Sequence, residues 1–197
     1  EGGGKPPGGG EDVRKRSGIL LLGSAHQINV DGVEWFLQRV LPLLREEPKL
    51  SSADLKVFIV GPDMNHKDSL KAHLSQGGVE IFGRLRGQDL ERLMQSCRVF
   101  ASPVVSGRPS FKTKNLEPLA NGMPVVTTRM GALGLHRPVP SGFNTTGVTI
   151  VRARAREFAD ALLQLLLLDE RWQEASEAGR RFIEENFLAD HLQEEMR

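Results

Sequence analysis

Six short apolar runs, most of them bounded by glycine or proline, constrain the fold of this chain more than any other feature. They are "GILLLG" (18–23), "LKVFIVG" (55–61), "VEIFG" (79–83), "RVFASP" (98–103), "MPVVTT" (123–128) and "GVTIV" (147–151). Nearly continuous apolar runs of this length are typical of strands that are covered on both faces. The sequence therefore predicts six largely buried strands.

The segments between these runs show helical spacing of apolar residues. The first two expected helices cover 31 to about 47 and 68–76. A third is capped near Gln88 or Asp89 and ends near 97, and a fourth begins near Thr113. After 155 we expect two amphipathic helices and a third short one. Pro42 should kink the first of them, because proline lacks the N–H that a helix interior needs. Strands alternating with helices favour parallel pairing through right-handed crossovers. We therefore expect an α/β fold with a doubly wound, mostly parallel six-stranded sheet and C-terminal helices.

The N-terminal residues have a different composition from the rest. Residues 1–17, "EGGGKPPGGGEDVRKRS", are rich in glycine and proline and cannot offset their ordering entropy by burial. We expect a disordered linker or tail there, and one Rossmann-like domain over 18–197. A linker in front of a domain, with no initial methionine, indicates a missing upstream part that would also hold any targeting sequence.

Composition excludes several classes of protein. A formal net charge of +1, with scattered basic residues, gives no support for nucleic-acid binding. No apolar run reaches the roughly 18 residues of a transmembrane segment. The lone Cys97 cannot form an internal disulfide and is expected to be a buried thiol, which favours a reducing, cytoplasmic location. Trp35 and Trp172 are expected in the core.

Several catalytic and metal-binding patterns are missing. Four histidines outside the first loop lack the spacing of metal ligands, so no metal site is expected. They are His66, His73, His136 and His191. Phosphate-binding G-x-x-x-x-G-K-(S/T) and nucleophile G-x-S-x-G patterns are absent as well. In a doubly wound sheet the ligand instead binds outside the carboxyl ends of the strands. The loops expected there are 23–29, 61–66, 83–87, 103–113 and 128–135.

One of these loops leads into an unusual helix start. Lys112 and Lys114 flank Thr113, where cations oppose the helix dipole, and Glu117 follows one turn later. The lysines make sense if a multiply charged anion docks there, with the glutamate accepting hydrogen bonds from a ribose diol. Taken by themselves, the same residues also fit solvated lysines and an ordinary helix salt bridge.

The surrounding segment "SFKTKNLEPLANGMPVVTTRMGALGL" (110–135) resembles the nucleotide-sugar-binding segment of GT-B glycosyltransferases of the family 4-like group 1. Members often show G-I-K-T-K-V-L-E-A-(L/M)-A-x-G-(V/M)-P-V-V-T-T-x-x-G-A-x-G-L. "LLGSAHQINVDGVEWFLQRVLPLL", "LKVFIVG" and "VEIFGRLRGQDLERLMQSCRVFASPV" resemble the preceding units in the same order. The likeness is continuous over about 18–187 and implies the C-terminal, donor-binding half of such an enzyme.

The resemblance also implies roles for particular residues. Glu117 would bind the ribose hydroxyls, backbone amides around Ser110 and Thr113 would meet the diphosphate, and Lys112 and Lys114 would balance its charge. The loop with Gly83, Arg84 and Leu85 would line the base, and the turn with Gly23 and Asn29 would complete the nucleotide-sugar site. No cofactor is implied beyond the nucleotide diphosphate sugar itself, which is the donor substrate. The transfer would be metal-independent and retaining, the partner would be the missing N-terminal GT-B domain, and the isolated fragment would be inactive or nearly so.

The chain departs from the family pattern at two places. Pro109 stands where the family's first glutamate would fall, with Ser110 replacing a usual glycine, and "GSAHQINVDG" lacks the Arg/Lys pair that neutralises the leaving diphosphate. Catalysis would then need Lys112, Lys114 or Arg84 to replace that pair. The alternative is a catalytically degenerate nucleotide-binding or scaffold module of the same fold. A dinucleotide-dependent oxidoreductase is disfavoured, because no G-x-G-x-x-G follows the first strand.

Overall fold

The computed structural model describes residues 16–50, 55–74, 77–108, 112–135 and 146–188. The sheet has six parallel strands in the order β3-β2-β1-β4-β5-β6, which confirms the predicted fold class. The strands are β1 (Ile19–Leu22), β2 (Val57–Val60), β3 (Val79–Phe82), β4 (Val99–Ser102), β5 (Val125–Thr128) and β6 (Val148–Val151). Strand order reverses between β1 and β4, which makes this pair the switch point of the sheet.

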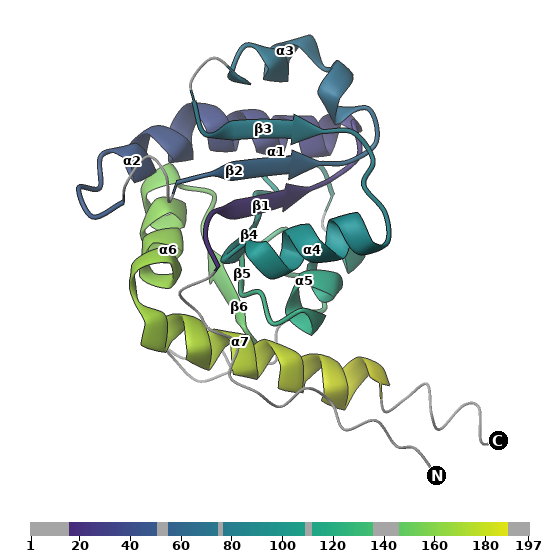
Figure 1. The fold of residues 1–197 in the computed structure, drawn as a ribbon, viewed down its shortest axis with the longest axis vertical. Helices are drawn as coiled ribbons and strands as arrows, with labels where there is room; N and C mark the ends of the chain where they lie inside the picture. The colour runs from purple at the N-terminus through teal and green to yellow at the C-terminus, as the bar shows by residue number, and fades with distance from the viewer. Residues whose placement is uncertain (1–15, 51–54, 75–76, 109–111, 136–145, 189–197) are drawn as a thin grey trace, which may run out of the picture.

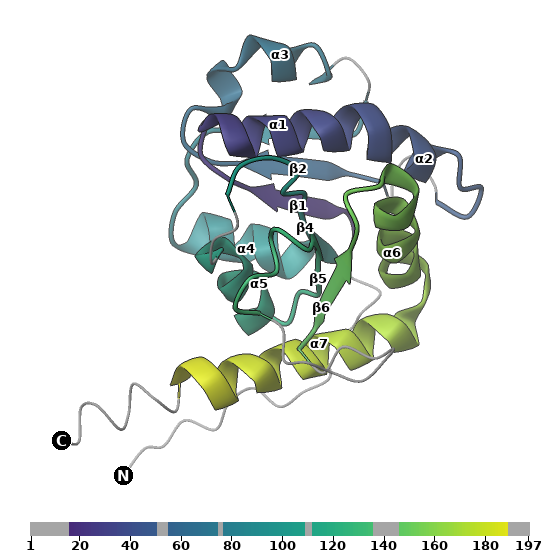
Figure 2. The ribbon, with the colours of Figure 1, turned by 180° about the vertical axis from the view of Figure 1, so that it is seen from behind.

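Helices cover both faces of the sheet (Figures 1 and 2). One face is covered by α1 (Gln27–Trp35), α2 (Leu41–Arg45) and α6 (Ala155–Leu167), and the other by α4 (Gln88–Ser96), α5 (Leu116–Ala120) and α7 (Asp169–Ile183). The short helix α3 (Asp68–Lys71) lies beyond β3 at the edge of the sheet (Figure 1). The remaining turns are η2 (Phe36–Val40), η3 (Met64–His66), η5 (Thr113–Asn115) and η6 (Glu184–Leu188).

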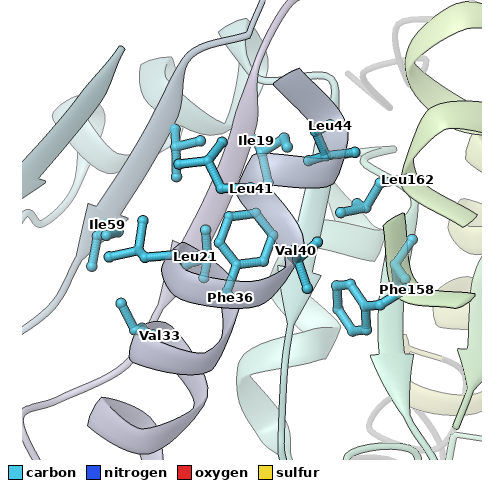
Figure 3. Packing of buried hydrophobic residues seen from close by; sticks show 14 of the residues in the cluster. Ile19, Leu21, Val33, Phe36, Val40, Leu41, Leu44, Ile59, Phe158 and Leu162 are labelled. Carbon is cyan, nitrogen blue, oxygen red and sulfur yellow. The ribbon is translucent and has the colours of Figure 1, made fainter. Parts of the chain in front are cut away.

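Each buried strand sends alternate side chains into two separate cores. Ile19 and Leu21 of β1 point to the α1 side, whereas Leu20 points to the α4 side. On the α1 side, Phe36 and Phe158 lie among aliphatic side chains from β1, β2 and α6 (Figure 3). This double burial explains why the strands read as continuous apolar runs.

The first crossover helix begins at Gln27, so the predicted start at Asp31 was wrong by four residues. The segment before Pro42 is not a regular α-helix. The turn before the proline, η2, has π geometry, and the N–H of Leu41 donates to the carbonyl of Phe36, five residues back. A widened turn relieves the clash between a proline ring and the carbonyl four residues earlier.

The carboxyl end of α5 is held by groups from other elements. Arg16 and Arg180 both donate to the carbonyl oxygen of Asn121, at 3.2 and 3.4 Å. Ser176 of α7 donates to the carbonyl oxygen of Gly122, at 2.6 Å. Short as it is, α5 is therefore fixed at this end to α7 and to the segment before β1.

The two tryptophans and the lone cysteine lie in or against the cores. Trp172 is buried, donates its indole N–H to the carbonyl oxygen of Arg98, and lies within 6 Å of the guanidinium groups of Arg16 and Arg98. Trp35 is half-buried and meets the ring of Phe158 edge-on at 5.5 Å. Cys97 is fully buried, and burial raises the pKa of its thiol to about 12. Trp172 and Cys97 are core residues, as predicted, whereas Trp35 is a partly buried side chain packed against the core.

Candidate functional site

The loops that follow β1, β2 and β3 are joined through their backbones. The N–H of Gly23 donates to the carbonyl of Val60 at 3.0 Å, and the N–H of Gly61 donates to that of Gly83 at 3.1 Å. A Cβ on Gly61 would overlap the carbonyl oxygen of Gly23, so only glycine fits this crossing. The structure thus brings Gly23 and Gly83, both predicted site residues, to one edge of the sheet.

A second set of contacts crosses the switch point between β1 and β4. Gly32 of α1 lies so close to the carbonyl oxygen of Pro103 that a Cβ there would overlap it. The carboxylate of Asp31 accepts hydrogen bonds from Gln27 at 2.6 Å and from Ser106 at 2.7 Å, and these two bonds lower the Asp31 pKa. The start of α1 is therefore tied to the loop after β4.

Sequence reasoning missed Asp31, Gly32 and Ser106 as part of this arrangement. A glycine inside a helical pattern was the available signal, because it weakens the helix and commonly marks a close backbone approach. Nothing in the sequence paired Asp31 with Ser106, which lies 75 residues away.

Lys114 is the residue that spans the switch point. Its Nζ donates to the carbonyl oxygen of Leu22, the last residue of β1, at 3.1 Å, and to Oδ1 of Asn29 at 3.2 Å. Asn29 is in turn held by a bond from its Nδ2 to the carbonyl of Ser24, at 3.0 Å. A Cβ at Gly23 would be 2.8 Å from the side chain of Asn29. Three predicted site residues, Gly23, Asn29 and Lys114, therefore lie together.

The charge on Lys114 is poorly compensated. An ammonium group has three N–H donors, and the two acceptors in place here are neutral oxygens. Among the described residues no carboxylate forms an ion pair with it. Burial, and then the charge of Lys112, lower the Lys114 pKa from 10.5 to about 8. Such a group would be stabilised by an anion beside it.

The other predicted residues of this segment lie close by in sequence and differ in exposure. Lys112 is half-buried at the cap of η5, Thr113 is exposed at its first position, and Glu117 is exposed on the first turn of α5. The Glu117 carboxylate makes no hydrogen bond or ion pair with the residues that the structure describes, so it is available to a ligand.

The helix start itself differs from the expected one. It is a single 3₁₀ turn followed by only five α-helical residues. Because a helix dipole is the sum of aligned peptide units, so short an element contributes little field. The positive charge at this edge therefore comes mainly from the lysine side chains.

The remaining predicted residues divide into two groups. Arg84 is exposed in the turn after β3, and Leu85 packs against the core on the α4 side. Ser110 and Pro109 lie outside the described residues.

Two buried polar groups near this edge have unused hydrogen-bonding capacity. Asn115 donates to the carbonyl of Gly131 at 3.0 Å, which joins η5 to the loop after β5. Its Oδ1, and the hydroxyl of Ser102 at the end of β4, have no partner among the described residues. Sequence reasoning did not single out either residue, because both read as ordinary small polar positions.

Within the described ranges, no group of three or more histidine, cysteine, aspartate or glutamate side chains could hold a metal ion. No helix in the same ranges is long and apolar enough to cross a membrane. The described groups of this segment are the Lys114 ammonium on the end of β1 and the exposed Glu117 carboxylate.

Comparison with known families agrees with this arrangement. The family described as Glycosyl transferases group 1 matches residues 16–167 of the chain, well over half of its length. The chain belongs to this family. Among curated proteins, the sequence search found no match.

Solved structures show the same fold at low sequence identity. The C-terminal domain of the glycosyl transferase group 1 protein LpcC from Francisella tularensis is 16% identical, with a TM-score of 0.66 over 87% of this chain and 86% of that one. Sucrose-phosphate synthase from Thermosynechococcus elongatus is 17% identical, with a TM-score of 0.67 over 92% and 44%. S. aureus TarM, in a complex that includes UDP, is 14% identical, with a TM-score of 0.68 over 91% and 34%.

These likenesses define which part of a transferase the chain corresponds to. The fold is that of the C-terminal, Rossmann-like domain of GT-B glycosyltransferases. The chain spans less than half the length of the sucrose-phosphate synthase and TarM chains.

Proposed function

We propose that this group 1 glycosyltransferase chain is the donor half of the enzyme, which binds a nucleotide diphosphate sugar and passes its glycosyl unit to an acceptor held by another domain. The single observation that best supports this is the Lys114 ammonium at the switch point, held by neutral groups only. The diphosphate would lie against Lys114 and Lys112, and the Glu117 carboxylate would accept hydrogen bonds from the ribose.

The first βα loop contains no arginine or lysine between Gly23 and Asn29. In our proposal Lys114 supplies the missing charge, because its Nζ contacts Asn29 in that loop. A cation facing the leaving diphosphate stabilises charge that develops in the transition state, which is worth several kcal/mol in enzymes. No metal or other cofactor is then needed. By family analogy the transfer is retaining.

Base recognition would depend on the loops after β1 to β3, whose edges consist largely of backbone groups. UDP is the first nucleotide to test, since TarM was solved with UDP and a similar Burkholderia enzyme is UDP-forming.

The acceptor site and further catalytic groups belong to the domain that the family places before this one. We therefore expect the isolated chain to bind donor weakly and to turn over little or not at all. The buried thiol of Cys97 fits a reducing compartment such as the cytoplasm.

A second candidate function is a degenerate module that retains the fold for assembly or sensing. The lack of a basic residue between Gly23 and Asn29 favours it. Calorimetry with UDP, GDP and ADP separates the two proposals. Base-selective binding that is lost in Glu117→Ala supports the donor site, because that carboxylate has no structural partner among the described residues. Absence of binding to all three nucleotides supports the scaffold.

A further inference from the structure

We propose that Lys114 takes up a proton when a nucleoside diphosphate binds, so that affinity for the donor is coupled to pH. This inference rests on the proposed function, since it concerns the same site. It adds a property that neither the fold nor the family implies.

The first support for the proposal is the geometry around Nζ of Lys114. The ammonium has two neutral acceptors, Leu22 O at 3.1 Å and Asn29 Oδ1 at 3.2 Å, and its third N–H has no partner among the described residues. A second cation, Lys112, is close enough to disfavour the charged form. Before a ligand binds, the charged form of Lys114 is therefore penalised, both by burial and by a like charge.

No described carboxylate offsets this penalty. The strand β1 contains only aliphatic side chains, and on α1 the Asp31 carboxylate is already occupied by Gln27 and Ser106. The other ionisable groups on the elements and loops around Lys114 are exposed or half-buried: His26, Glu34, Arg108, Lys112, Glu117 and Arg129. An incoming diphosphate would be the first anion to meet the ammonium at close range.

The direction of the coupling follows from these charges. In the unliganded chain the pKa of Lys114 is about 8, and a diphosphate beside it would raise this pKa by opposite charge. Affinity should then be constant below about pH 7.5 and fall as pH rises through 8, approaching tenfold per pH unit. The phosphate groups of the ligand do not produce this trend, because the second ionisation of a phosphate group lies near pH 6.

Calorimetry with UDP, over pH 7.0–9.0 and in two buffers of different ionisation enthalpy, tests the proposal on the intact chain. At pH 8 binding should take up about half a proton. Uridine, which lacks the diphosphate, corrects for ionisation of the base. If UDP binds and no proton uptake beyond that of uridine is found at pH 8, the proposal is overturned.

Calorimetry on four variants identifies the residue that takes up the proton when UDP binds. Lys114→Met should bind UDP more weakly and lose the proton uptake, and Lys114→Arg should lose the uptake because arginine stays charged. Lys112→Met is the matched control: it removes a neighbouring cation, so it should keep the uptake and move its onset to higher pH. His26→Gln should leave the uptake unchanged. Uptake that persists in Lys114→Met refutes the assignment, even if Lys114→Arg does not fold. If UDP, GDP and ADP all fail to bind at every pH, the proposed function itself falls, and this inference with it.

Discussion

Replacing Lys114 by methionine should stabilise the unliganded chain while weakening the proposed ligand site. Methionine keeps the length of the apolar stem and removes the ammonium. The pKa of Lys114 falls from 10.5 to about 8, so the charged side chain lowers the free energy of unfolding by about 3 kcal/mol at pH 7. Losing the hydrogen bonds to Leu22 and Asn29 costs about 1 kcal/mol or less each, since water can reach these partly buried acceptors. The net expectation is a gain of about 1–2 kcal/mol.

The pH dependence has a defined sign. Between pH 8 and 10.5 the unfolded chain holds a proton on Lys114 that the folded chain has lost, so wild-type stability rises with pH in this window. Lys114→Met has no such group. Its advantage over wild type should therefore be largest below pH 8, shrink through the window, and turn into a deficit above it, where only the two lost hydrogen bonds remain.

Urea unfolding at pH 7 and at pH 10 measures the difference in the free energy of unfolding. In thermal unfolding at pH 7 the melting temperature should rise by about 3–6 °C for a domain of this size. Lys56→Met, which removes an exposed lysine directly before β2, is the control for loss of a solvated charge. A Lys114→Met variant that is less stable than wild type by the same amount at both pH values would refute the reasoning.

Three further predictions concern the packing that positions the site. Gly32→Ala should destabilise the chain by about 3 kcal/mol in urea unfolding, because its Cβ would overlap the carbonyl oxygen of Pro103; a loss below 1 kcal/mol would mean that the two elements can separate easily. Trp172→Phe should lower the free energy of unfolding by about 2–3 kcal/mol in the same assay. It removes the indole N–H that donates to the carbonyl of Arg98 and the larger ring beside the two guanidinium groups. An unchanged free energy of unfolding would contradict a stabilising role for Trp172. Cys97 should react with a thiol reagent only after unfolding, because burial raises its pKa to about 12; rapid labelling of the native chain would show that it is accessible.

The sheet was predictable because its strands are buried on both faces. Runs such as Val57–Val60 are apolar throughout, and a glycine follows β1, β2 and β3 directly. The start of α1 was not predictable in the same way. His26 makes no side-chain capping bond, and the first turn after it has no helical period of apolar residues. The π turn before Pro42 was foreseen only as a kink, since backbone register depends on how the helix packs.

The candidate site was predictable as a segment but not as an arrangement. In the sequence Lys112 and Lys114 look equivalent, and only the folded chain distinguishes them, by placing one ammonium on the end of β1 and on Asn29. The link from Ser106 to Asp31 was beyond sequence reasoning for the same reason. Both depend on contacts between residues that are 75 or more positions apart.

The anchoring of α5 has a consequence for variants far from the ligand. This helix is only five residues long, and the carbonyl groups of the two residues after it, Asn121 and Gly122, accept hydrogen bonds from α7 and from Arg16. We expect a displacement of α7 to be passed on to α5 through these bonds, because so short a helix has little length over which to bend. If the proposed donor site is correct, side-chain changes on α7 should therefore alter nucleotide affinity without changing a residue that is proposed to contact the ligand.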